Sequence, residues 1–179
     1  MKPVLLASTI LLTLAACGQG EEKGRKQSAQ EVAKEMAALK MEPGQWEATN
    51  EILSASAAGL PEQALKQMVG QKTTVSNCVT PEQAAKPSAN FLAAQKNSNC
   101  TYQDFSMEDG RMTGTMSCSG GQVPGQMEMK MEGEYSARSY DMNMDMNAKN
   151  MPGGMTMTIK ARTTGRKVGE CRPGEAAAK

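Results

Sequence analysis

Five cysteines carry most of the reactive chemistry of this 179-residue chain, and histidine is absent. Without imidazole, the chain lacks the commonest general base and metal ligand of proteins. Ser-His-Asp and Cys-His nucleophile arrangements and imidazole zinc sites are therefore excluded. The sequence also contains no GxGxxG, P-loop or GxSxG pattern. We expect a protein that is not an enzyme and holds no cofactor, in which the cysteines serve attachment and cross-linking.

The first cysteine, Cys17, ends an N-terminal segment that has the order of a secretory leader. Lys2 supplies a positive start, and the apolar run 4–14 is too short to span a hydrocarbon core of about 30 Å. Ala15 and Ala16 then precede the cysteine. This arrangement resembles the bacterial lipoprotein signal, in which the cysteine sulfur receives a diacylglyceryl group and cleavage occurs just before it. We therefore expect residues 1–16 to be a signal peptide and Cys17 to be the lipid attachment site.

Lipidation at Cys17 predicts where the mature chain is located. Several acyl chains hold a protein at a membrane far more firmly than one does, because each buried methylene contributes about 0.8 kcal/mol. Gly18 stands at the position where an aspartate favours retention at the inner membrane in the lipoproteins that this signal resembles. We expect a cell-envelope protein held at the periplasmic face of the outer membrane, with the membrane as its partner through acylated Cys17.

The charge balance of the mature chain argues against one class of partner. Removal of residues 1–16 leaves a chain the size of one domain, with 19 basic and 19 acidic side chains. Proteins that bind nucleic acid present a strong basic surface, and a chain with a net charge of zero gives no sign of one. We therefore expect no nucleic-acid partner.

The four remaining cysteines predict two disulfides, because their number is even and the expected compartment is oxidising. Two strands are predicted around a three-residue loop that ends in Gly110, the usual glycine position in a loop of this length. This loop places Cys100 opposite Cys118, at a separation that a disulfide can close. The remaining bridge is then Cys78–Cys171. A metal site made of the four thiolates is the alternative, but the cysteines lack CxxC spacing.

The chain divides into four segments after the leader. Polar residues 17–27 are expected to be a flexible tether. Residues 28–41 are expected to form an amphipathic helix, which begins with a capping box at Ser28 and continues with an apolar stripe at helical spacing. Residues 42–171 are expected to form the disulfide-bonded domain, and residues 172–179 a flexible tail.

Methionine alternates with polar residues along segments 127–132, 140–146 and 155–160. This alternation is typical of antiparallel strands that have one buried face and one solvated face. We expect a mainly β domain: an antiparallel meander sheet of about seven strands, curved or partly closed into a barrel, with two or three short helices. The predicted apolar interior or ligand face comprises Trp46, Met116, Met127, Met129, Met131, Tyr140, Met142, Met144, Met146, Met155, Met157 and Ile159.

The abundance of methionine leaves several functions open. Methionine side chains fill irregular space and adapt to varied shapes, so they suit either a filled core or a pocket for a small apolar ligand. Their thioethers also suit Cu(I). Alternation over three segments uses more methionines than a three- or four-ligand site needs, so we assign no metal site. We expect a non-enzymatic binding or structural role, with a lipocalin-like carrier of a small apolar ligand and a methionine-based copper-binding protein as alternatives.

A set of short motifs connects the chain with a known family. They are GQWE at residues 44–47, CVTPE at 78–82, MSCSG at 116–120 and GRKVGEC at 165–171. In this order and spacing they resemble the proteobacterial family catalogued as domain of unknown function 3617, whose members are secreted or lipid-anchored envelope proteins. The resemblance covers roughly residues 42–171 and implies a location and a fold but no activity.

The pattern Gly44-x-Trp46 after a predicted helix also looks like the opening of lipocalin-type barrels. Those barrels place a basic side chain from a late strand against the tryptophan. Arg166 is the candidate for that position here, as a cation–π partner of Trp46.

Overall fold

The computed structural model describes residues 24–37, 39–86, 99–120 and 123–172. The predicted signal peptide 1–16, the predicted attachment site Cys17 and most of the predicted tail lie outside the described residues. The elements in chain order are β1 (Lys26–Gln27), α1 (Ala29–Ala37), β2 (Gly44–Ala57), α2 (Glu62–Met68), β3 (Lys72–Val79), α3 (Pro81–Ala85), β4 (Asn99–Glu108), β5 (Arg111–Gly120), β6 (Val123–Tyr135), β7 (Ser139–Met151), the 3-10 helix η1 (Pro152–Gly154) and β8 (Met155–Gly169).

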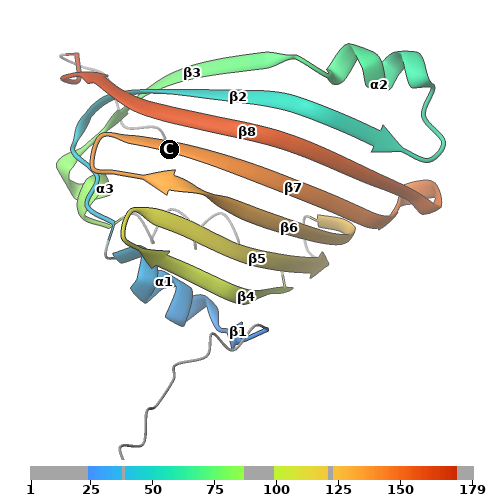
Figure 1. The fold of residues 1–179 in the computed structure, drawn as a ribbon, viewed down its shortest axis with the longest axis horizontal. Coiled ribbons are helices and arrows are strands. Elements are labelled where there is room, and N and C mark those ends of the chain that lie inside the picture. The colour runs from blue at the N-terminus through green and yellow to red at the C-terminus, as the bar shows by residue number, and fades with distance from the viewer. Residues whose placement is uncertain (1–23, 38, 87–98, 121–122, 173–179) are drawn as a thin grey trace, which may run out of the picture.

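All eight described strands lie side by side in one curved sheet (Figure 1). The strand order is β1-β4-β5-β6-β7-β8-β2-β3, and every pairing is antiparallel. Strands β4 to β8 form the expected meander. The last strand, β8, also pairs on its other side with β2, which comes earlier in the chain. The prediction of a mainly β, antiparallel meander with short helices is confirmed. The sheet stays open, because its edge strands β1 and β3 do not pair with each other.

The register of the strands gathers the methionines on one face of the sheet, here called the methionine face. Met129 of β6 lies opposite Met116 of β5 and Met146 of β7. Cross-strand partners share a face of a sheet, so these three side chains point the same way. Their charged neighbours Glu128 and Lys130 are exposed on the opposite face. The alternation along the sequence therefore separates an apolar from a polar surface.

Helix α1 covers one part of the methionine face. It begins with the predicted capping box, in which the Ser28 N–H donates to Glu31 Oε2 at 2.7 Å and the Glu31 N–H donates to Ser28 Oγ at 3.3 Å. Its Val32 is fully buried against the β4–β5 end of the sheet, beside which α1 lies in Figure 1. The buried residues of this core cluster are Val32, Tyr102, Phe105, Met107, Met116 and Cys118.

The other described helices do not extend this cover. Helix α2 buries none of its residues, and α3 buries Ala84 alone. Figure 1 shows α2 at the far end of the connection between β2 and β3, away from α1. None of the helices in the described part of the chain combines the length and the apolar character needed to cross a bilayer.

Two disulfides are present, and they join the pairs that the sequence predicted. Cys100 and Cys118 are opposite residues of β4 and β5, with their Cα atoms 4.1 Å apart. Cys78 near the end of β3 is bonded to Cys171 just after β8, across 93 residues of sequence and a Cα–Cα distance of 5.3 Å. The first bridge reinforces a local hairpin, whereas the second ties an edge strand to the end of the domain.

The tether ends earlier than expected, because residues 24–27 belong to the domain. Strand β1 pairs with β4, and the side-chain amide of Gln27 exchanges hydrogen bonds of 2.9 and 2.7 Å with the backbone of Phe105. The Asp104 carboxylate accepts the backbone N–H groups of Gly24 and Arg25 at 2.8 to 2.9 Å. Asp104 can do so because a register shift in β4 holds it at a φ of 51°.

Asp104→Ala should detach residues 24–27 from β4. The two N–H groups lose a charged acceptor, and alanine tolerates a positive φ less well than aspartate, so we expect the free energy of unfolding to fall by about 1–2 kcal/mol. Limited trypsin digestion should then cleave faster after Arg25 and Lys26. Asp104→Asn is the matched control, since asparagine accepts the same φ and keeps one acceptor oxygen. Equal cleavage of Asp104→Ala and the parent protein would contradict this role.

Candidate functional site

The methionine face is only partly covered in the described structure. The core cluster under α1 involves β4, β5 and the neighbouring methionines of β6. Apolar side chains farther along the same face are partly buried but lie outside that cluster. We call this region the open band; its residues are Ile52 and Ala55 of β2, Met144 and Met146 of β7, and Met157, Ile159 and Ala161 of β8. The described part of the chain therefore buries one part of its apolar face more completely than the other.

A small apolar pocket lies where the covered and open parts of the face meet. Its volume is about 230 Å3, and the surface that lines it is apolar throughout. Met36 of α1 and the following Leu39 form one wall, and Trp46 of β2 and Met142 of β7 contribute another part of the lining. The complete lining is Met36, Leu39, Met41, Trp46, Met107, Met112, Tyr135, Ser136, Ser139, Tyr140 and Met142.

Two stacked aromatic rings form part of the pocket wall. The rings of Trp46 and Tyr140 are 6.2 Å apart with an angle of 15° between their planes, and the indole N–H donates to the Glu42 carbonyl oxygen at 2.9 Å. Tyr140 lies over Gly165 of the neighbouring strand, where a side chain would overlap the ring. Burial raises the pKa of the Tyr140 hydroxyl, so the ring stays neutral beside the apolar lining.

The expected cation–π contact between Arg166 and Trp46 is wrong. Arg166 lies opposite Glu47 in the β2–β8 register, on the other face of the sheet, and its guanidinium is 3.1 Å from the Glu47 carboxylate. The basic residue opposite Trp46 is Lys167. Its side chain is 10% exposed and its ammonium group is paired with Glu42 at 3.4 Å and with Glu170 at 3.0 Å.

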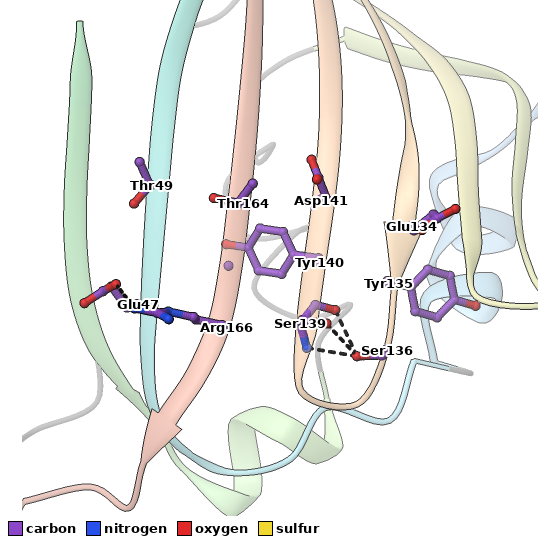
Figure 2. Close-up of a pocket in the computed structure, with 11 residues that line it drawn as sticks. Glu47, Thr49, Glu134, Tyr135, Ser136, Ser139, Tyr140, Asp141, Thr164 and Arg166 are labelled. Carbon is purple, nitrogen blue, oxygen red and sulfur yellow. Dashed lines mark hydrogen bonds and ion pairs between the residues drawn. The ribbon is translucent and has the colours of Figure 1, made fainter.

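The opposite face of the sheet carries a hollow of about 400 Å3 near the turn between β6 and β7 (Figure 2). Charged and hydroxyl side chains line it, including Glu47, Thr49 and Asp141. Figure 2 shows Arg166 directed at Glu47, and Ser139 and Ser136 joined by hydrogen bonds. Glu47 is thus paired with Arg166, and Ser136 with Ser139, as is typical of a solvated charged surface.

The side chains of this hollow are poorly suited to general acid–base catalysis. Hydrogen bonds from Arg162 lower the pKa of the Asp141 carboxyl, which therefore stays ionised as the partner of the guanidinium. A carboxylate held in this way is a poor proton donor near neutral pH. Within the described ranges, no three His, Cys, Asp or Glu side chains come together as a metal-binding group.

The register brings all twelve residues of the predicted apolar face together on the methionine face. Three of them, Trp46, Tyr140 and Met142, line the apolar pocket. The sequence did not indicate which residues of the face would do so. Sequence reasoning missed the contribution of α1 and of Met41, Met107 and Met112. The apolar stripe of the predicted helix was a signal for this wall, but the sequence did not say which strands the stripe would cover.

Comparisons with known proteins place the chain in a family. The family model described as "Protein of unknown function (DUF3617)" matches residues 41–171, and the chain belongs to that family. No curated protein and no solved structure shows a significant match to the chain. The family resemblance inferred from the short motifs is therefore confirmed.

Gly165→Ala should disturb the aromatic wall. The new Cβ would meet the Tyr140 ring, so the ring must move away from Trp46, the single tryptophan of the chain. Overpacking of this kind costs about 1–3 kcal/mol of unfolding free energy, and the emission of Trp46 should shift. Gly169→Ala on the same strand is the control, because no heavy atom lies within 4 Å of the added carbon. Identical emission spectra for the two variants would contradict the packing described.

Proposed function

We propose that this member of the DUF3617 family is a non-enzymatic, lipid-anchored protein of the bacterial cell envelope that binds an elongated apolar molecule along its methionine face. The observation that supports the proposal is the open band, which continues from the apolar pocket across β7, β8 and β2, beyond the core cluster that α1 covers. The side chains of the band are partly exposed, and contiguous apolar surface that stays accessible is typical of binding sites.

The shape of the site favours a ligand that is long and narrow. The pocket, at about 230 Å3, is smaller than the ~300–1,000 Å3 of common small-molecule sites. It can therefore enclose one end of a ligand, while the open band receives the remainder. Six residue steps along β7 from Tyr140 to Met146 give this surface a length of roughly 20 Å. An acyl chain has the proportions and the chemistry that such a surface fits.

The choice of methionine also supports binding of variable apolar ligands. An unbranched thioether side chain changes rotamer at low cost and can follow the outline of a flexible chain. Asn50 and Thr163 provide one polar point on the same face, where the Asn50 amide donates to the Thr163 hydroxyl at 2.8 Å. That pair offers a place for a polar group of a ligand beside its apolar part.

The proposed location rests on the sequence, since the leader and Cys17 lie outside the described residues. The order of a positive start, a short apolar run and Ala15-Ala16-Cys17 supports a lipoprotein signal. Two disulfides in a domain of this size are consistent with an oxidising compartment. The absence of histidine from the sequence supports a non-enzymatic role.

Trp46 gives a direct test of ligand binding, because it is the only tryptophan and lines the pocket. Addition of 9,10-dibromostearate, a fatty acid whose bromine atoms quench indole emission at short range, should quench Trp46 in a saturable manner. Met144→Gln should weaken this binding about tenfold, because an unpaired amide set against an apolar chain costs about 1–3 kcal/mol.

Asn143→Gln is the matched control for that variant. It introduces the same side chain at the neighbouring residue of β7, on the polar face, where Asn143 is exposed. This control should bind the probe as the parent protein does. Absence of saturable quenching in the parent, or equal weakening by the two variants, would contradict binding on the methionine face.

A further inference from the structure

Four methionines form a compact rectangle at the centre of the methionine face. Met129 of β6 lies opposite Met146 of β7, and Met131 lies opposite Met144 in the next pair on the same face. All four side chains are partly buried and so remain accessible. The rectangle lies at the border between the core cluster, which Met129 and Met131 contact, and the open band.

The dimensions of the rectangle allow the four sulfur atoms to converge. Cross-strand neighbours have Cβ atoms about 4.5–5.5 Å apart, and residues two apart on a strand are separated by about 7 Å. A methionine side chain is unbranched and has three rotatable bonds, so each sulfur can reach toward a common centre above the sheet. Valine or isoleucine would fill the same surface but would offer no donor atom.

We propose that Met129, Met131, Met144 and Met146 form a thioether site for a soft monovalent cation, Cu(I). Thioether sulfur is a soft neutral ligand, and soft ligands select Cu(I) over the harder divalent ions. Binding requires no change of oxidation state and no deprotonation, because the thioethers have no proton to lose. The site differs from the apolar ligand site in the chemistry it uses, and it does not depend on the proposed function.

The other side chains of the described domain that could bind a metal ion near the rectangle lie on the opposite face of the sheet or are already bonded. Cys78, Cys100, Cys118 and Cys171 are all in disulfides, so these thiols are not available to the metal. The carboxylates next to the rectangle in sequence, such as Asp145, lie on the opposite face of the sheet, where Asp145 pairs with Lys160 at 3.4 Å. Thioethers are therefore the donors that this part of the methionine face presents.

Anaerobic titration of the full-length protein with Cu(I), in competition with bicinchoninate, tests the site. The parent protein should withdraw about one equivalent of Cu(I) from the chelator, and Ag(I) should protect the four methionines from oxidation by hydrogen peroxide. Met129→Leu with Met146→Leu should weaken Cu(I) binding by more than about tenfold, because changes outside the ligand shell of metal sites already cost roughly 10–100-fold.

Met151→Leu with Met155→Leu is the matched control, because these residues also face each other across two strands but lie outside the rectangle. This control should keep the affinity of the parent protein for Cu(I). Leucine preserves the apolar surface, so both double variants should unfold at the same temperature as the parent protein, which separates loss of a metal ligand from damage to the fold. No competition by the parent protein, or equal Cu(I) affinity of the two double variants, would overturn the proposal.

Discussion

The structure depends on the packing of one short helix against one side of a wide sheet. Helix α1 has nine residues and is therefore about 14 Å long, whereas eight strands spaced by about 4.8 Å span roughly 34 Å. Val32 and Tyr102, both essentially inaccessible to solvent, mark the place where helix and sheet meet. The alternation of methionine continues well beyond that place. The sequence thus makes more apolar sheet surface than its described helices cover, and this excess is the basis of the proposed binding site.

The two faces of the sheet contribute differently to the stability of the domain. The polar face carries ion pairs between neighbouring strands, such as Arg162 with Asp141, and exposed pairs of this kind contribute about 1 kcal/mol or less to stability. The methionine face supplies the hydrophobic stabilisation at one end and adaptable apolar surface at the other. The disulfides compensate for the limited core, because they restrict the unfolded chain at the hairpin and between β3 and the end of β8.

Local rules predicted much of this fold. Side-chain alternation has a period of two, so the methionine face could be assigned from the sequence. The Cys100–Cys118 pair was predicted correctly, but the three-residue loop used to predict it is wrong: Glu108 pairs with Arg111 across a two-residue turn. The register shift between Gln103 and Ser106 then restores Cys100 opposite Cys118. Long-range register could not be predicted in the same way. The β2–β8 register, which sets Trp46 opposite Lys167 and Glu47 opposite Arg166, decides that Lys167 shares the face of Trp46 and Arg166 does not. Likewise, β1 has only two residues, and its place depends on the irregular backbone at Asp104, for which the sequence gives no signal.

One part of the methionine face is open while another part is buried under α1. Brief oxidation of the native protein with hydrogen peroxide, followed by peptide mass spectrometry, measures this directly, because sulfoxide formation follows the exposure of each thioether. We predict that Met144, Met146 and Met157 are oxidised several times faster than the buried Met107, Met116 and Met142. Equal oxidation rates for the two groups would contradict it.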